Sequence, residues 1–256
     1  MGNNLFDLSG RNAIVTGSTK GIGKAIASAL AQHGARVVIS SRDESRVSSV
    51  VEELCSDGLE VIGIPCNVGR KTELEKLVYE TNQRWGDIDI AIGNAAINPH
   101  YGSSLDIPDE IFSKTMASNI QSNLWLAQLV APGMRKKRDG SIIFVSSIGG
   151  FFGSEVIGTY CVSKAGDFQL ARNLAVELGP DNIRVNCIAP GLVKTDFARK
   201  LWEDPEASKV RIQRTPLRRL GDPEDLAGIA IYLASDAGKW TTGQTISVDG
   251  GVTISK

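Results

Sequence analysis

A tyrosine and a lysine stand four positions apart in the stretch TYCVSKAG, residues 159–166, and these two side chains could exchange a proton with a ligand. The stretch predicts a helix, where positions i and i+4 share one face, so the ammonium of Lys164 is expected one turn from the phenol of Tyr160. An isolated tyrosine has a pKa of ~10, and a neighbouring cation favours its phenolate. The spacing therefore predicts a phenol tuned toward neutral pH for general acid or base catalysis.

A glycine-rich turn near the amino terminus could hold the phosphates of a dinucleotide. The sequence VTGSTKGIGKAIA, residues 15–27, follows an apolar run that predicts a strand and opens a stretch that predicts a helix. Glycines let the backbone approach a pyrophosphate closely, and the amides at the start of the helix face the anion. This context supports dinucleotide binding more strongly than three glycines alone would. The contacts predicted in this turn are made by Gly17, Ser18, Lys20, Gly21, Ile22 and Gly23.

The end of the second predicted strand indicates which nicotinamide cofactor is preferred. An acidic residue there would bind the ribose 2′-hydroxyl of NAD, but this sequence has Ser41 followed by Arg42. A hydroxyl and a guanidinium can bind a 2′-phosphate through charge-assisted hydrogen bonds, and Lys20 adds a second positive charge. The sequence therefore predicts NADP(H). The alternative is that Arg42 only pairs with Asp43 or Glu44 on the surface.

Short β-branched runs alternate with longer helical stretches along the whole chain. This alternation is typical of a parallel sheet with helices on both faces. Strands are predicted at residues 12–17, 35–40, 59–66, 88–94, 140–147, 182–190 and 244–251. Helices are predicted at residues 21–34, 44–58, 71–86, 109–137, 159–179 and 222–236. The expected fold class is α/β, a single Rossmann-type doubly wound parallel sheet of seven strands in one domain, residues 1–256.

Several separate motifs stand in the order and spacing of one enzyme family. They are TGSTKGIG, GNAA, the last serine of VSS, YCVSK and PGLVKT. With these motifs the chain, from about residue 8 to residue 252, resembles the short-chain dehydrogenases/reductases. The resemblance implies hydride transfer between a nicotinamide cofactor and a carbonyl or secondary alcohol.

The same resemblance implies the catalytic residues. Tyr160 is implied as the general acid or base, and Lys164 as the group that lowers its pKa and binds the nicotinamide ribose. Ser147, 13 positions before Tyr160, is implied to orient the substrate oxygen. Asn119, within the long helix predicted at 109–137, is implied to hold a water that links the lysine to solvent, with Asn123 as a rival one turn later.

Further cofactor contacts follow from the resemblance. Asn67 stands where the family commonly has an aspartate near the adenine, and its amide oxygen can still accept from the adenine amine. The turn GNAA resembles the one that packs against the adenine-side ribose, and PGLVKT resembles the loop that holds the nicotinamide amide. The implied contacts are Asn67, Val68, Asn94, Ala95, Pro190, Gly191, Val193 and Thr195, together with Tyr160 and Lys164.

The substrate pocket is predicted to be apolar and covered by a flap. Residues 190–221 form the one long irregular connection, and loops of that size in a compact domain are often lids over a ligand. Its partly amphipathic middle predicts a short helical flap at about residues 192–214. The expected apolar lining consists of Ile97, Ile148, Phe151, Phe152, Leu192, Phe197 and Trp202.

Three stretches narrow the predicted function. VVISSR, NAAINP and GLVKTDFARKLW are similar to those of NADPH-dependent carbonyl and retinal reductases. The expectation is an NADP(H)-dependent carbonyl reductase for apolar ketones, ketoesters or aldehydes. One alternative is a 3-oxoacyl thioester reductase. A non-enzyme alternative is a module that senses NADP(H) without turnover, although such proteins usually lose part of the serine, tyrosine and lysine set that this chain keeps.

Composition argues against several other classes. The formal net charge is −1 and basic residues are scattered apart from residues 135–138, so neither nucleic acid nor an anionic membrane is an expected partner. No signal-peptide pattern opens the chain, and no apolar run reaches the ~18 residues of a bilayer span. Four scattered cysteines and two histidines predict a reducing cytoplasm and no metal site. By resemblance the protein is expected to be a homotetramer that acts on a small molecule.

Overall fold

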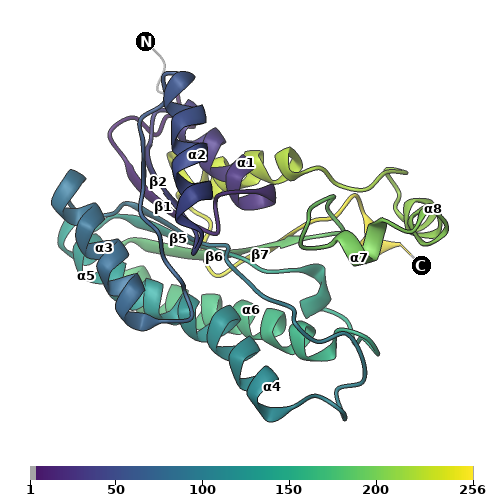
Figure 1. Cartoon of the computed structure of the whole chain (residues 1–256). Coiled ribbons are helices and arrows are strands. Elements are labelled where there is room, and N and C mark those ends of the chain that lie inside the picture. Colours follow the sequence, from purple (N-terminus) through teal and green to yellow (C-terminus); the bar gives the residue numbers. More distant parts are fainter. Residues whose placement is uncertain (1–3, 256) are drawn as a thin grey trace.

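The sheet has the strand order β3-β2-β1-β4-β5-β6-β7, and every neighbouring pair is parallel (Figure 1). This order comes from a computed structural model that describes residues 4–255, so residues 1–3 and 256 of the predicted domain lie outside the described residues. The predicted doubly wound α/β fold is confirmed. The strands are β1 Asn12–Thr16, β2 Arg36–Ser40, β3 Val61–Gly63, β4 Ile90–Gly93, β5 Gly140–Val145, β6 Ile183–Pro190 and β7 Thr245–Val248.

Helices cover both faces of the sheet, and the central strands are apolar for that reason. β1, β4 and β5 are buried at every position, as strands between two helical layers must be. One layer holds α1, α2 and α9, and the other holds α3, α4, α5 and α6 (Figure 1). Their bounds are α1 Gly21–Gln32, α2 Glu44–Ser56, α3 Lys71–Trp85, α4 Asp109–Met116, α5 Ser122–Lys137, α6 Gly158–Leu178 and α9 Ala227–Ala234.

The strand order reverses between β1 and β4, and this reversal fixes where a ligand can bind. After β1 the chain enters α1 on one face, and after β4 it enters α4 on the other. Ligands of open α/β sheets bind at the carboxyl ends of the strands beside such a switch point. Most residues predicted to carry chemistry follow the carboxyl ends of β1, β2, β4, β5 and β6.

The helix predicted over residues 109–137 is divided in the structure. α4 ends at Met116, a single π-helical turn covers Ala117–Gln121, and α5 continues from Ser122. Such π-turns inside a helix are frequent at functional sites. Here the turn carries Asn119, whose side chain is buried against the loop after β4. The division therefore follows from a tertiary contact that a local pattern does not contain.

The segment predicted as a flap contains two short helices, α7 Arg199–Trp202 and α8 Pro205–Arg214. Figure 1 shows both beside the carboxyl terminus, at the end of the molecule away from α2 and α3. Asp204 caps α8 by accepting from the amides of Glu206 and Ala207, and Pro205 occupies the first helical position. Within residues 4–255, no helix combines the length and apolar character needed to cross a bilayer.

Candidate active site

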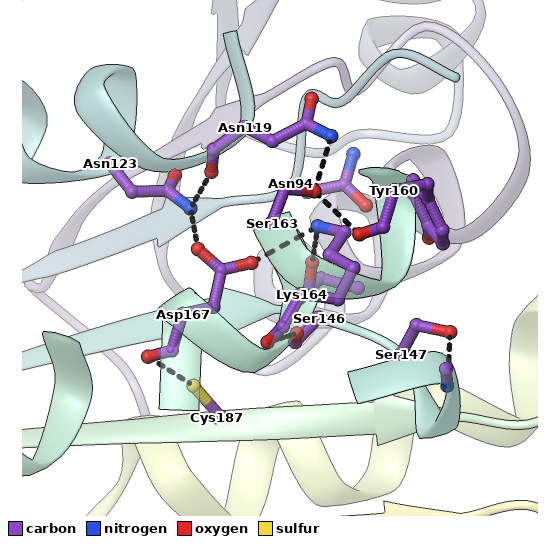
Figure 2. Close-up of polar contacts among 12 residues, drawn as sticks. Asn94, Asn119, Asn123, Ser146, Ser147, Tyr160, Ser163, Lys164, Asp167 and Cys187 are labelled. Carbon is purple, nitrogen blue, oxygen red and sulfur yellow. Dashed lines mark hydrogen bonds and ion pairs between the residues drawn. The ribbon is translucent and has the colours of Figure 1, made fainter. Parts of the chain in front are cut away.

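The tyrosine and lysine of the TYCVSKAG stretch lie on one face of α6, as their spacing predicts (Figure 2). Lys164 Nζ is 5.7 Å from the centroid of the Tyr160 ring. Both side chains are buried, with 9% of Tyr160 and 2% of Lys164 exposed. At this distance the ammonium acts electrostatically on the phenol.

Burial and charge act in opposite directions on the phenol. Burial raises the pKa of Tyr160, while the ammonium of Lys164 and the hydroxyl of Ser147 act to lower it, and the net direction is upward. The sequence predicts a shift toward neutral pH because it registers the neighbouring cation but contains no measure of burial. The phenol is therefore held as a proton donor, and the structure corrects the direction of the predicted shift.

Ser147 follows β5 and forms the amino-terminal cap of a short 3₁₀ turn, Ile148–Gly150. Its Oγ accepts a hydrogen bond from the amide of Gly149 at 3.0 Å, which leaves the hydroxyl proton available to a ligand. The preceding Ser146 is buried, and its Oγ donates to the backbone oxygen of Lys164 at 2.8 Å. The two serines therefore divide their roles, since Ser146 fastens β5 to α6 and Ser147 faces the phenol.

The ammonium of Lys164 is held by two hydrogen-bond acceptors that were not predicted from the sequence. Its Nζ donates to the backbone oxygen of Val145 at 3.0 Å and to Oδ2 of Asp167 at 3.2 Å. Asp167 is fully buried one turn further along α6. The signal available in the sequence was an acidic residue three positions after the lysine, which places it on the same helix face.

The two candidate asparagines have different partners (Figure 2). Asn119 donates to the oxygens of Ile97 and Ser163, each at 2.9 Å, and its Oδ1 accepts from the amide of Ile97. Asn123 donates through one Nδ2 to the backbone oxygen of Asn119 and to Oδ1 of Asp167, each at 2.9 Å. Asn119 thus fixes the loop after β4, and Asn123 connects that turn to Asp167. The water predicted beside Asn119 stays a prediction.

The glycine turn has the shape of an anion cradle. Gly17 and Gly21 adopt φ values of +66° and +54°, which other residues rarely reach. A Cβ on Gly23 would lie 2.4 Å from both Nδ2 of Asn94 and the oxygen of Gly17. The first turn of α1 has no side-chain cap and no acidic residue, so its amides are available to a phosphate. These features fit a dinucleotide pyrophosphate.

Two predicted contacts in this region hold the turn in place. Ser18 is fully buried, and its Oγ donates to the oxygen of Val15 and accepts from the amide of Ser40. Asn94 donates to the oxygens of Thr16 and Gly17 at 2.8 and 3.1 Å. Both side chains thus shape the cradle from inside the fold. The predicted cofactor contacts in the turn that leave a side chain accessible are Lys20 and Ile22.

At the end of β2, neither neighbouring acidic residue forms an ion pair with Arg42 among the described residues. Asp43 caps α2 by accepting from the amide of Arg46, and it forms an ion pair with Nε of Arg46 at 3.0 Å. Across residues 4–255, Arg42 forms no ion pair with Asp43 or Glu44. The alternative, in which Arg42 only pairs with Asp43 or Glu44 on the surface, is therefore not observed among the described residues.

Lys20, the second predicted phosphate ligand, has a partner on the flap. Its Nζ lies 3.3 Å from Oδ2 of Asp196, and both side chains are about half exposed. Asp196 also pairs with Arg199 at 2.5 Å. The pair joins the glycine turn to the start of the flap, so an anion bound by Lys20 would compete with Asp196.

The remaining predicted cofactor residues lie along the same edge of the sheet. Oδ1 of Asn67 accepts from the amide of Gly69 at 3.1 Å, and the neighbouring Val68 packs on the apolar core. Thr195 approaches the glycine turn, since a Cβ on Gly21 would lie 3.0 Å from its Cγ2. The other members are Ala95, whose amide donates to Thr16, Pro190 at the end of β6, Gly191 against Asp249, and Val193, which is paired with Gly221.

Apolar side chains gather around the phenol on the substrate side. The Phe197 ring lies 5.9 Å from that of Tyr160, centroid to centroid. Ile148 and Leu192 line a cavity of about 360 Å³ that extends to Arg211 and Arg214 of α8. Phe151 packs instead on Phe168 of α6, with 4.6 Å between centroids, and Phe152 meets the edge of Phe151. Of the expected lining residues, Ile148 and Leu192 line the cavity, whereas Phe151 and Phe152 pack outside it, next to α6.

The flap makes a hydrogen bond within itself and a contact with the loop after β4. Trp202 Nε1 donates to the oxygen of Thr195 at 2.9 Å, and the ammonium of Lys200 lies 4.7 Å from the centroid of the Tyr101 ring. His100, in the same loop as Tyr101, contacts the oxygen of Ser103 and so stays within its own loop. No group of three or more His, Cys, Asp or Glu side chains arranged for a metal ion occurs in the described part of the chain.

Comparisons with known sequences cover nearly the whole chain. A family model described as enoyl-(acyl carrier protein) reductase matches residues 17–253. Dehydrogenase/reductase SDR family member 4 of Homo sapiens is 45% identical over 244 residues, which make up 95% of this chain and 88% of that protein. Dehydrogenase/reductase SDR family member 2, mitochondrial, also of Homo sapiens, is 40% identical over 243 residues, or 95% and 86% of the two chains.

Solved structures share the fold over the same length. A gluconate 5-dehydrogenase from Burkholderia cenocepacia J2315, in complex with NADP and tartrate, has a TM-score of 0.94 at 30% identity and covers 99% of each chain. A 7α-hydroxysteroid dehydrogenase complexed with NADH and 7-oxo glycochenodeoxycholic acid has a TM-score of 0.94 at 36% identity, covering 98% of this chain and 97% of that one. With relatives and a family model matching along almost its full length, the chain belongs to the short-chain dehydrogenase/reductase family of oxidoreductases.

Proposed function

We propose that this protein is an NADP(H)-dependent carbonyl reductase for apolar ketones, ketoesters or aldehydes. The observation that carries the proposal is the phenol of Tyr160, buried one turn from Lys164, beside Ser147 and packed near the ring of Phe197. A phenol that keeps its proton at neutral pH suits a general acid for a carbonyl oxygen.

Each side chain of the set has a separate task in this mechanism. Tyr160 donates its proton to the substrate oxygen, and the hydroxyl of Ser147 donates a hydrogen bond to the same oxygen as charge develops there. Lys164 supplies the positive charge that stabilises the phenolate left behind. The nicotinamide cofactor supplies the hydride to the carbonyl carbon when bound. In alcohol oxidation Tyr160 takes the proton as a base.

The preference for NADP(H) over NAD(H) rests on the end of β2. Arg42 is exposed and has no ion pair with Asp43 or Glu44 among residues 4–255, and Ser41 lies beside it. A guanidinium free of carboxylates is well suited to a 2′-phosphate. Lys20 adds a second cation once Asp196 releases it. Among the family neighbours above, one structure contains NADP and another NADH, so the choice depends on these residues.

The substrate class rests on the walls of the pocket. Phe197 packs beside Tyr160, and Ile148, the residue after Ser147, lines a cavity together with Leu192. Residues 192–214 act as a flap whose Lys200 contacts Tyr101 in the loop after β4. We propose that the described residues form a single domain with this flap. Arg211 and Arg214 also line the cavity, so a substrate with a polar tail also fits.

We also propose a cytoplasmic homotetramer. Val162 and Val176 are exposed apolar residues on α6, and Trp240 and Ile254 are exposed on either side of β7. Exposed apolar side chains on two separate faces support assembly through two interfaces. The four cysteines are free thiols, which suits a reducing compartment.

The test is the initial rate of NADPH oxidation against ketones, diketones, ketoesters, aldehydes and an acetoacetyl thioester. Wild type and Tyr160→Phe are measured together, with NADPH binding followed by fluorescence as a control for cofactor affinity. We expect turnover of apolar carbonyls by the wild type and its loss in the variant at similar NADPH affinity.

Other outcomes distinguish the competing functions. Preference for the acetoacetyl thioester would replace the carbonyl reductase with a 3-oxoacyl thioester reductase. NADPH binding without turnover of any compound would favour a sensor of NADP(H). Turnover that survives Tyr160→Phe unchanged would reject the proposed mechanism.

A further inference from the structure

Asp167 is a buried carboxylate that the proposed mechanism does not use. It is fully excluded from solvent, on the face of α6 that carries Tyr160 and Lys164. Its Oδ2 accepts from Lys164 Nζ at 3.2 Å, and its Oδ1 accepts from Asn123 Nδ2 at 2.9 Å (Figure 2). Every oxygen of the carboxylate therefore has a partner, and one partner is the lysine beside the phenol.

A lysine buried this deeply needs a counter-charge to keep its proton. Buried lysines without one have their pKa lowered by several units. Burial acts to lower the pKa of Lys164, but Asp167 acts against it, and the net direction is upward. The lysine is thus a cation in the core because a carboxylate accompanies it.

The surroundings of the pair contain few other charges. On the remaining sides the groups that face the carboxylate are neutral, the amide of Asn123 on α5 and the hydroxyl of Ser146, the residue after β5. Burial raises the pKa of Cys187, so its thiol stays protonated, and its Sγ donates to the backbone oxygen of Asp167. The titratable groups that act on the pair from the packed elements are Tyr160 of α6 and Cys187 of β6, and Arg172 of α6 acts on Cys187.

The two acceptors beneath Lys164 also set its orientation. An ammonium has three N–H donors. One points to Val145 O at 3.0 Å and one to Asp167 Oδ2 at 3.2 Å. The third is left for the side of the lysine on which Tyr160 and the strand ends lie.

We propose that Asp167 is a positioning residue that keeps Lys164 protonated and directs its remaining N–H toward the active site, while Asn123 holds Asp167 in place. For its kinetic consequence the proposal rests on the reductase function proposed above. Because Asp167 is fully excluded from solvent, it acts through Lys164 and not by contact with substrate or cofactor.

The effect of removing the carboxylate on the pKa of Tyr160 depends on whether Lys164 keeps its proton. If Lys164 kept its proton without Asp167, the loss of a negative charge would lower the pKa of Tyr160, because Asp167 itself acts to raise it. If Lys164 lost its proton, the phenol would lose its neighbouring cation and the pKa of Tyr160 would rise. The direction of the change therefore tests the proposal.

The first measurement is the ultraviolet titration of the Tyr160 phenol in the full-length protein. Wild type and Asp167→Asn are each titrated against the same background carrying Tyr160→Phe, which subtracts the other tyrosines. We expect the midpoint to move to higher pH by about one unit, a tenfold change in the ionisation constant. An unchanged midpoint, or one at lower pH, would overturn the proposal.

A matched control separates this effect from general damage to a buried ion pair. Asp89 is 5% exposed and pairs with Lys137 at 2.8 Å, at the opposite end of the sheet. Asp89→Asn should leave the midpoint of Tyr160 where it is in the wild type. A shift as large as that of Asp167→Asn would mean that loss of a buried pair alone moves the phenol, and would overturn the proposal.

The kinetic measurement distinguishes failure of this proposal from failure of the proposed function. In Asp167→Asn, kcat for alcohol oxidation at neutral pH should fall about tenfold, with little change in the KM for substrate, and recover as pH rises. A shifted midpoint in a protein without carbonyl turnover would uphold the role of Asp167 and reject the reductase. Carbonyl turnover with an unshifted midpoint would reject the role of Asp167 and uphold the reductase.

Asn123→Ala provides a second route if Asp167→Asn fails to fold, as judged by circular dichroism. It removes the amide donor from Asp167 Oδ1 but leaves the carboxylate and Lys164 intact. Loosening the carboxylate should move the midpoint of Tyr160 in the same direction by a smaller amount. A folded Asn123→Ala protein with the wild-type midpoint would count against the proposal.

Discussion

In the proposed mechanism the chemistry depends on the phenol of Tyr160, whose surroundings favour its protonated form. Burial raises its pKa more than Lys164 and Ser147 together lower it. The protonated phenol is the form that donates to a carbonyl, and the phenolate is the form that accepts a proton from an alcohol. At neutral pH the phenol is therefore protonated, which is the form that the proposed reduction requires.

This balance predicts a pH dependence with opposite signs in the two directions. For alcohol oxidation, kcat/KM should rise from neutral into alkaline pH, because the fraction of phenolate grows as the pH approaches the raised pKa of Tyr160. For ketone reduction it should fall over the same alkaline range. Initial rates in both directions across that range make the comparison. Oxidation that slows as pH rises would contradict the assignment of Tyr160 as the base.

Arg42 is the residue that should decide cofactor preference. Replacing it with alanine is expected to raise the KM for NADPH about ten- to hundredfold and leave that for NADH nearly unchanged, since a hydrogen bond to a charged group contributes about 1.5–3 kcal/mol. Arg46→Ala is the matched control, because Arg46 is an exposed arginine of the same region that is already paired with Asp43. Unchanged preference for NADPH in Arg42→Ala would make the NADP(H) assignment wrong.

At the scale of elements, the sequence predicts structure well where packing is local. β1 and β5 lie within the β-branched runs at 12–17 and 140–147, because strands buried on both faces need continuous apolar sequence. The strand predicted at 59–66 shortens to Val61–Gly63, and Pro65 beyond it has no N–H to donate to a ladder. Local patterns thus give the elements and miss some of their ends.

Elements that depend on distant contacts could not be predicted in this way. The π-turn at Ala117–Gln121 exists alongside hydrogen bonds between Asn119 and the backbone of Ile97, 22 positions away. The role of Asp167 depends on its complete burial against Asn123, which lies on another helix. For the site, motif order gave the serine, tyrosine and lysine, whereas the groups beneath the lysine required the packed structure.

The glycine turn gives a prediction at the same scale. Gly23→Ala would place a methyl group 2.4 Å from Asn94 Nδ2 and from the oxygen of Gly17, so the turn must move. We expect NADPH affinity, measured by fluorescence titration, to fall at least tenfold, since ~1.4 kcal/mol of lost phosphate contact suffices. Gly228→Ala is the control, because nothing lies within 4 Å of its added Cβ. That variant should bind NADPH normally and gain about 0.5–1 kcal/mol of stability as an alanine within a helix.

At the scale of the whole molecule, the strand order brings separate parts of the sequence to one edge. The cradle follows β1, the phosphate-binding candidates follow β2, and the proposed catalytic side chains follow β4 and β5 or lie on α6. A chain of this topology therefore keeps its chemistry at the carboxyl ends of the strands and leaves other faces for assembly. Two such faces carry exposed apolar residues, Val176 on α6 and Trp240 before β7.

Assembly through these two faces predicts how the oligomer should come apart. Val176 is 80% exposed in the single chain, so an aspartate there costs the subunit little but would place a charge within an α6 interface. Light scattering should therefore give a tetramer for the wild type and a dimer for Val176→Asp, because the face near β7 is untouched. Tyr79→Asp, an equally drastic change at an exposed site on α3, should remain tetrameric. A monomeric wild type, or a tetrameric Val176→Asp protein, would show that α6 does not join the subunits.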